Sequence, residues 1–362
     1  MEYSYQERCW IWLSYVRGMT PKRFYRALAE AGDAADIYEQ PAEFKSAFEP
    51  KVYESLMRAR SEEPPDEVAD QLEKRGVIAI TRMGNAYPPR LEHISDPPPT
   101  LFVLGSPCLE LDRPLAVVGT RRASYEGRKT ALEFCRELAL QGASIVSGLA
   151  RGIDTFSHTA CLDAGSRTVA VLGNGLGSIY PPENAELAQR ITESGGSLVS
   201  ELRLDEAPAR WTFPARNRLI AGLSDAVLVV EGDRKSGSLI TAGYALEEGR
   251  DVFAVPGSIY SPLSEGPNSL IQSGAYMALS PWNILETMRW GSRPLSAKAE
   301  KTPPALDEKE KKIYDLLKNE AMSFSELEDR GGFQAPELNS CLTMMSLRSI
   351  IIKLPGNVYR LA

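Results

Sequence analysis

The chain has 362 residues, which exceeds most single hydrophobic cores and indicates two or three domains. Hydrophobic residues make up 43% and charged residues 25%, a balance typical of a soluble globular protein and not of a disordered one. The formal charge is −7, so binding of nucleic acid requires that basic residues gather in one place.

The cysteines and the amino terminus indicate where in the cell the protein resides. Five cysteines are scattered without C-x-x-C spacing, which favours reduced thiols over a zinc site or a disulfide framework. The amino-terminal MEYSYQERCW lacks an apolar signal core, and no run approaches membrane-spanning length. We therefore expect a cytoplasmic protein with no metal, no cofactor and no membrane partner.

Residues 1–85 predict a helical SAM-like domain. CWIWLSYV, PKRFYRALAEA and DEVADQLEKRG carry helical patterns between Gly, Pro and acidic turns. The segment VRGMTPKRFYRAL is either a degenerate helix-hairpin-helix that touches a nucleic-acid backbone or a small packing module. We favour packing, because residues 19–21 replace the second glycine of the hairpin.

Residues 86–288 predict an extended Rossmann-like domain of the α/β class. The strand VIAITR precedes it, and the prolines at 97–99 make the segment before TLFVLG an extended lead-in. Five apolar runs then reach a glycine and are followed by helical patterns: LAVVGT, ASIVSG, TVAVLGNG, AVLVVEG and DVFAVPG. This repeat predicts a mostly parallel, doubly wound sheet, whose strand-end turns share one edge.

The turns at this edge carry the groups that bind phosphate. Glycine lets the backbone approach a ligand, helix-initial amides and hydroxyls bind phosphate oxygens, and arginine adds a planar cationic fork. Two further turns, FPARNR at 213–218 and SGS at 236–238, add to those after the strands. The candidate residues are Gly119, Thr120, Arg121, Arg122, Ser147, Gly148, Gly152, Phe213, Arg216, Asn217, Arg218, Ser236 and Ser238. We predict a site for a phosphate backbone, where Phe213 and neighbouring Trp211 either stack on bases or pack under the turn.

Two other phosphate-binding motifs are missing from the chain. The first strand ends in Gly-Thr-Arg-Arg instead of G-x-G-x-x-G, and no acidic residue closes the second strand to hold a ribose. No G-x-x-x-x-G-K-[ST] string occurs. These absences argue against a nicotinamide enzyme and a nucleoside triphosphatase.

Four further polar residues have two interpretations each. Asp154 is a general base or a helix cap, and capping is favoured because Asp suits a helix start. His158 lacks a nearby cysteine nucleophile or metal-ligand spacing, which favours a structural role. Glu201 and Glu231 form a hydrolytic pair or orient arginines of FPARNR. We favour orientation, because the sequence shows no fixed second acid or metal cluster.

The carboxyl-terminal part predicts a linker and a winged helix. Residues 289–306 are rich in Pro, Ser, Ala and Lys without apolar periodicity, and residues 307–362 give three helices and a small hairpin. The third helix offers Glu337, Asn339 and Arg348, and this segment has eight Lys or Arg against nine Asp or Glu. Since a groove-reading helix needs basic and amide side chains, we expect weak DNA binding at best and a protein contact as the main use.

These residues resemble the bacterial DNA-processing protein A family (DprA, also called Smf). The motifs that carry the resemblance are YPPRLEHISDPPPTLFVLG, AVVGTRRAS, SGLARGIDTFSH, TVAVLGNGLGSIYPPEN, FPARNRLIAGLS, VVEGDRKSGSLITAGYALEEGR and VFAVPG followed by GPNSLIQSG. The resemblance implies a cytoplasmic, noncatalytic protein that binds single-stranded DNA, protects it and helps load the recombinase RecA in natural transformation. It also implies a homodimer formed through the Rossmann-like domain.

The resemblance implies that the predicted turns form the DNA pocket of the family. Gly119, Thr120 and Arg121 would hold a phosphate, and the other candidates of the second strand end and FPARNR would complete the wall. Two positions differ from the family pattern. Thr120 replaces a usual serine and keeps the hydroxyl, whereas Ala215 stands where some members have lysine and removes a cation.

Two other functions stay open at the level of sequence. The sheet domain is also similar to LOG-type nucleotide phosphoribohydrolases, whose P-G-G-x-G-T string and glutamate are partly echoed by SGSLITA and Glu247. Alternatively, the tail makes the protein mainly a docking adaptor.

Overall fold

The computed structural model describes residues 3–291, 306–318, 321–348, 350–354 and 356–361. They form two compact units, one within residues 1–293 and one within residues 294–362. The predicted linker at 289–306 lies mostly outside the described residues, since 292–305 are not among them.

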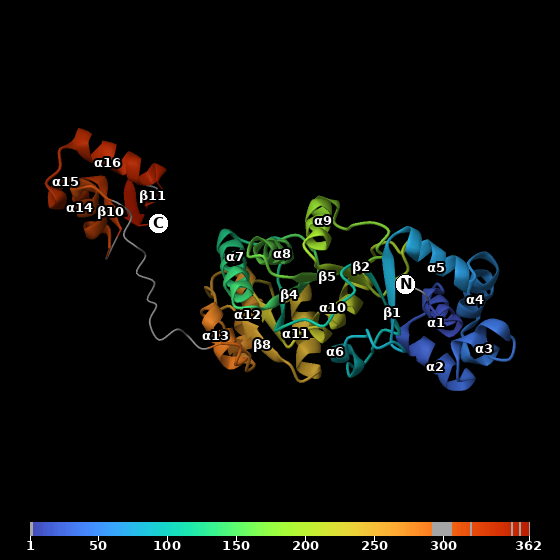
Figure 1. Cartoon of the computed structure of the whole chain (residues 1–362). Coiled ribbons are helices and arrows are strands. Elements are labelled where there is room, and N and C mark those ends of the chain that lie inside the picture. The colour runs from blue at the N-terminus through green and yellow to red at the C-terminus, as the bar shows by residue number, and fades with distance from the viewer. Residues whose placement is uncertain (1–2, 292–305, 319–320, 349, 355, 362) are drawn as a thin grey trace. The chain divides into compact units, whose positions relative to one another are not determined.

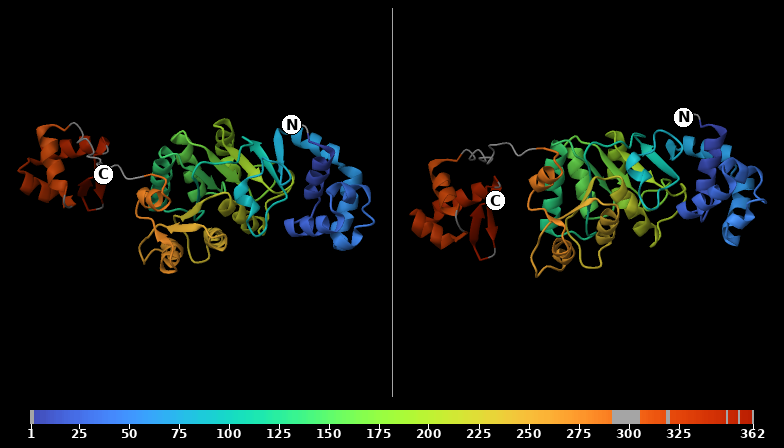
Figure 2. Two further views of the ribbon diagram at one scale, coloured as in Figure 1. Left: turned by 60° about the horizontal axis from the view of Figure 1, so that its bottom comes forward. Right: turned by 90° about the horizontal axis from the view of Figure 1, so that it is seen from below.

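The first unit begins with short helices packed beside one edge of its sheet (Figures 1 and 2). They are α1 (Tyr5–Tyr15), α2 (Pro21–Ala31), α3 (Ala34–Glu39), the 3₁₀ turn η1 (Lys45–Ala47), α4 (Pro50–Glu62) and α5 (Pro65–Lys74). Local sequence sets their starts: Ser4 and Glu7 form a capping box, and proline opens α2, α4 and α5. The indole of Trp10 donates to the carbonyl of Pro99 at 2.8 Å, which ties these helices to the lead-in.

A nine-stranded sheet forms the centre of the unit. Its strands are β1 (Val77–Thr81), β2 (Thr100–Gly105), β3 (Pro114–Val118), β4 (Ser144–Ser147), β5 (Thr168–Val171), β6 (Ser197–Ser200), β7 (Ala226–Val229), β8 (Asp251–Ala254) and β9 (Tyr276–Met277). They lie in the order β1-β2-β6-β5-β4-β3-β7-β8-β9, and β3 to β9 are parallel. β1 and β2 are antiparallel to their neighbours. The predicted mostly parallel sheet is confirmed.

Helices cover both faces of this sheet (Figure 1). The helices of the domain are α6 (Pro89–Glu92), α7 (Tyr125–Leu140), α8 (Ile153–Asp163), α9 (Ala185–Glu193), α10 (Thr212–Gly222), α11 (Gly237–Glu247), α12 (Glu265–Gln272) and α13 (Pro281–Thr287), with 3₁₀ turns η2 (Pro182–Asn184) and η3 (Pro262–Ser264). One apolar cluster joins the strands to α7, α8 and α13, and another joins them to α6, α10 and α11. Because both faces are covered, the strands are continuous apolar runs.

The strand order reverses between β3 and β7. From β3 the chain moves to β4, β5 and β6 on one side, and it then returns to β7 on the other side of β3. The loops that leave β3 and β7 therefore diverge at their carboxyl ends, which is where ligands bind in doubly wound sheets.

The second unit has a hydrophobic core of its own. It contains α14 (Glu308–Leu317), β10 (Met322–Ser323), α15 (Phe324–Gly331), α16 (Ala335–Leu347), β11 (Ile351–Leu354) and β12 (Val358–Leu361). The strands pair in the order β10-β12-β11, and Ile313, Leu327, Leu342 and Tyr359 are buried between them and the helices. The three helices and the hairpin expected in this segment are present.

Three features differ from the expectations of the sequence. The repeat of five runs does not include β6, although Glu201 was expected at the end of a strand there, and β9 was missed; both strands extend the parallel part of the sheet. β1 lies within residues 1–85 and yet forms an edge of the central sheet. FPARNR was expected in a turn, and this is wrong: residues 212–222 form α10.

Candidate phosphate-binding site

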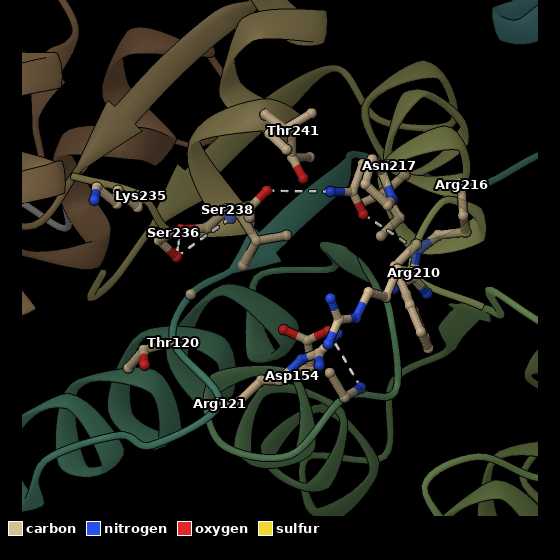
Figure 3. Close-up of a pocket in the computed structure, with 18 of the residues that line it drawn as sticks. Thr120, Arg121, Asp154, Arg210, Arg216, Asn217, Lys235, Ser236, Ser238 and Thr241 are labelled. Carbon is tan, nitrogen blue, oxygen red and sulfur yellow. Dashed lines mark hydrogen bonds between the residues drawn. The ribbon is translucent and has the colours of Figure 1, made fainter. Parts of the chain in front are cut away.

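A cavity of about 750 Å³ opens at the carboxyl ends of β3 and β7, where the strand order reverses. The turn after β3, the start of α10 and the start of α11 surround it, and their side chains face a common space in Figure 3. The predicted residues that line it are Gly119, Thr120, Arg121, Arg122, Phe213, Arg216, Asn217, Ser236 and Ser238. The structure therefore brings most of the predicted site together.

The floor of the cavity, defined by Asp154 and Arg216, holds a buried guanidinium. Arg216 is only 5% exposed, and its Nη1 donates to the carbonyl of Gly148 at 2.8 Å and to the carbonyl of Val171. A Cβ on Gly148 would lie 2.5 Å from Nη2 of Arg216. Glycine is therefore needed at position 148 to leave room for the guanidinium.

Asp154 is the acidic member of the floor and is also 5% exposed. Its Oδ2 accepts the amides of Gly148 at 3.0 Å and Ala150 at 3.3 Å, so it holds the loop after β4. The capping role expected for Asp154 is wrong, because the N-cap of α8 is Gly152 and has no side-chain bond.

Burial acts on both charges of the floor. It raises the pKa of Asp154, an effect that Arg216 and the two amides oppose. It lowers the pKa of Arg216 to about 10, with Asp154 acting in the opposite direction and Arg121 adding to the decrease. The guanidinium is therefore still charged at neutral pH, and the floor places it near a carboxyl group whose ionisation is opposed by burial.

His158 lies in the core beneath this region and does not line the cavity. It is fully buried, and its Nδ1 is 2.7 Å from Oγ1 of Thr168. Burial lowers the pKa of His158 to about 3, and the nearby Arg216 guanidinium adds to the decrease. The imidazole is neutral at physiological pH, in agreement with the structural role predicted for it.

The rim of the cavity, defined by Arg121, Arg122, Arg210 and Lys235, is cationic and exposed. Among the described residues none of these four side chains makes an ion pair. With Arg216 they give the lining five positive side chains, against the carboxylates of Asp154 and Asp233. The cavity is thus locally positive in a chain of net charge −7.

Phe213 forms an aromatic part of the wall. The Arg121 guanidinium lies 5.0 Å from the centre of its ring, and the Tyr180 ring centroid is 5.8 Å away. A Cβ on Gly173 would approach the Phe213 ring to 2.7 Å, so that glycine provides the space for it. The ring both packs in the wall and borders the cavity.

The start of α11 contributes hydroxyls and backbone amides. Ser236 is the N-cap, and its Oγ accepts the amide of Ser238 at 3.4 Å and lies 2.8 Å from the Ser238 hydroxyl. Nδ2 of Asn217 donates to the carbonyl of Gly237 at 3.1 Å and joins α10 to α11. A helix start with hydroxyls facing a cationic cavity suits an anionic ligand.

The other predicted residues lie outside the cavity lining. Gly148 borders a narrow adjoining recess with Arg121 and Phe213. Ser147 is fully buried and donates to the Val117 carbonyl at 2.6 Å. Gly152 has φ 77°, and a Cβ there would lie 2.3 Å from the Thr120 carbonyl oxygen. These residues shape the turns without facing the cavity.

Arg218 is buried beside Glu201 and does not reach the cavity either. Its two terminal nitrogens donate to the Glu201 carboxylate at 2.7 and 2.5 Å, which confirms the orienting role expected for this glutamate. For Glu231 the same expectation is wrong. Its carboxylate accepts the amide and hydroxyl of Ser124, at 2.9 and 2.6 Å, at the start of α7.

Sequence reasoning missed several lining residues, among them Arg210, Lys235, Tyr180 and Thr241. Arg210 directly precedes Trp211, and Lys235 directly precedes SGS, so both adjoin residues already singled out. Their positive charge was the signal that the sequence offered. Tyr180 and Thr241 carry no charge or motif that marks them.

The fold and the site define a class: a doubly wound α/β protein with a cationic pocket at its switch point, where such folds bind ligands. Within the described part of the chain, no cluster of three or more His, Cys, Asp and Glu side chains is arranged to hold a metal ion. None of the helices described is long and apolar enough to cross a bilayer.

Comparison with known proteins gives the family. Residues 78–289 match the model of DNA recombination-mediator protein A. Protein Smf of Escherichia coli is 43% identical over 280 residues, which cover 76% of this chain and 75% of that protein. The chain therefore belongs to the DNA recombination-mediator protein A family.

Two solved structures are similar to this one. The X-ray structure of DNA processing protein A from Streptococcus pneumoniae has 35% identity and a TM-score of 0.65, covering 79% of this chain and 98% of that chain. The second is DNA processing protein A from Helicobacter pylori, whose structure was described for its single-stranded DNA binding mode. It has 31% identity and a TM-score of 0.54, covering 59% of this chain and 95% of that chain.

Proposed function

We propose that the cavity binds the sugar-phosphate backbone of single-stranded DNA without sequence preference. The observation that carries this proposal is the rim, where four exposed cations without ion-pair partners among the described residues face a pocket with helix-start hydroxyls. Phosphate contacts of this kind hold a strand but do not read bases. The binding mode named for the Helicobacter pylori relative supports the same ligand.

We further propose that the protein protects incoming single-stranded DNA and promotes RecA loading during natural transformation in the cytoplasm. Membership of a recombination-mediator family supports a step between DNA and a recombinase. We also propose a homodimer formed through the Rossmann-like domain, as the resemblance to DprA implies.

The domain functions are likewise proposals. Residues 1–85 would form a SAM-like packing module, 86–288 the DNA-binding domain, and 307–362 a winged helix that contacts a protein. In the tail, Glu337 pairs with Lys309 and Arg348 pairs with Glu310 at 2.9 Å. The tail thus places charges in internal pairs, which supports a protein contact over strong DNA binding.

The alternative of a LOG-like phosphoribohydrolase is not favoured by the geometry. Glu247, the glutamate on which it depends, is exposed at the last residue of α11. It lies eleven positions beyond Ser236, or about 16 Å along the helix axis. Glu247 is not among the residues that line the cavity.

The proposal is tested by replacing Arg121, which is exposed and can be removed without disturbing the core. We expect Arg121→Ala to weaken binding of oligothymidylate and of mixed-sequence oligonucleotides about tenfold, since a charge-assisted contact is worth about 1.5 kcal/mol. Fluorescence anisotropy measures the affinity. Arg136→Ala, an equal loss of charge on the exposed surface of α7, should bind as the wild type does. Unchanged binding by Arg121→Ala contradicts the proposal.

A further inference from the structure

Two large exposed aromatic side chains stand close in sequence to residues that line the cavity. Tyr125 begins α7 three residues after Arg122 and is 76% exposed, and Trp211 directly follows Arg210 and is 61% exposed. Arg122 and Arg210 both line the cavity. In Figure 3, Arg210 and the turn that carries Thr120 lie on opposite sides of the cavity. Tyr125 and Trp211 therefore come, in the chain, shortly after lining segments on two different sides of the cavity.

The fold gives neither ring a structural task. Among the described residues, neither side chain makes a hydrogen bond, a ring contact or a cation–π contact. Phe213, by contrast, is covered by the Arg121 guanidinium. The rings of Tyr125 and Trp211 thus offer free aromatic surface.

Cations accompany both rings. Arg122 precedes Tyr125, and Arg128, whose guanidinium lies 5.1 Å from the centre of the Phe156 ring, follows it in the first turn of α7; both arginines are exposed. Arg210 precedes Trp211. Sites for single-stranded nucleic acid combine such cations, which track the phosphates, with aromatic rings on which any base can stack. A protein partner would not by itself account for this alternation of ring and cation on both sides of a phosphate site.

We propose that the bound strand extends past the cavity in both directions, with one base stacked on Tyr125 and another on Trp211. This inference rests on the proposed function and deepens it. The cavity holds phosphates, and the two rings hold the flanking nucleotides without reading their sequence. The binding site is then longer than the cavity.

The experiment compares affinities for oligothymidylates from about three to about sixteen nucleotides, a range that spans known single-strand sites. Tyr125→Ala and Trp211→Ala should each weaken binding of the longest oligomer about fivefold or more, since one stacked base contributes at least about 1 kcal/mol. Binding of the shortest oligomer should not change. Leu140→Ala, which removes a 56% exposed side chain at the far end of α7, is the matched control.

Fluorescence supplies a direct readout of stacking on Trp211. The long oligomer should quench tryptophan emission of the wild type and quench Trp211→Phe less, whereas Trp211→Phe should keep most of the affinity. Wild-type affinity of both alanine variants for the longest oligomer overturns the inference, and so does an equal loss at every length. If Arg121→Ala also binds as the wild type does, the proposed DNA-binding function itself fails. Arg121→Ala thus separates failure of the proposed function from failure of the stacking inference alone.

Discussion

The floor and the rim of the cavity use arginine in opposite ways. Arg216 in the floor is 5% exposed and is fixed by two main-chain carbonyls, with Asp154 as a nearby counter-charge. Arg121 in the rim is exposed and has no ion-pair partner among the described residues. The floor therefore builds the site, and the rim is the part that we propose contacts the DNA. Guanidinium groups at one sheet edge are not equivalent, and burial decides which task each performs.

The strongest test of this difference is to remove the buried arginine of the floor. Arg216→Ala should lower the free energy of unfolding by about 3–5 kcal/mol, because it leaves the buried carboxylate of Asp154 without its counter-charge. Urea unfolding followed by tryptophan emission measures this free energy. All five tryptophans lie between residues 10 and 290, in the same unit as Arg216, so their emission reports the unfolding of that unit. A variant as stable as the wild type would mean that Arg216 is not part of the structural floor.

A glycine of the loop gives the next largest effect. Gly152→Ala should lower the free energy of unfolding by at least about 2 kcal/mol, because the left-handed backbone and a Cβ 2.3 Å from the Thr120 carbonyl oxygen both oppose it. Gly237→Ala is the matched control, since a Cβ there meets no atom within 4 Å. Urea midpoints that coincide for the two variants would refute the role given to Gly152.

The effect that is smallest per step, about 1.4 kcal/mol for each pH unit, concerns the buried imidazole of His158. His158 has a pKa near 3 in the fold and about 6.5 when unfolded, so the unfolded chain binds the proton first as pH falls. Stability from neutral His158 is complete above about pH 6.5 and is lost as pH falls toward 3. Between these limits the free energy of unfolding should fall by up to about 1.4 kcal/mol per pH unit more steeply than in His158→Gln.

Asp154 acts in the opposite direction, because its raised pKa gives stability that is present at low pH and lost as pH rises. The wild type and His158→Gln both contain Asp154, so its contribution to the pH dependence of stability largely cancels when the two are compared. Equal pH slopes for the two proteins would show that His158 is protonated as readily in the fold as in the unfolded chain.

The sequence predicted the sheet and its binding edge well, because apolar runs that reach a glycine mark parallel strands and their turns. It did not tell which arginines face the ligand. FPARNR was read as a turn, whereas in α10 residues two apart point to nearly opposite sides, at about 100° per residue. Arg216 consequently reaches the cavity, and Arg218 turns to Glu201. Lys235 and Arg210 were missed because no motif marks a single exposed cation.

The central claim is that the rim binds phosphates, and the salt dependence of binding tests it most directly. The affinity for oligothymidylate should fall linearly in a plot of log K against log salt concentration, with a slope of about 0.7 for each phosphate neutralised. We predict that Arg121→Ala reduces this slope by about 0.7 and that Arg136→Ala leaves it unchanged. A slope near zero in the wild type, or one that Arg121→Ala does not alter, would contradict the account.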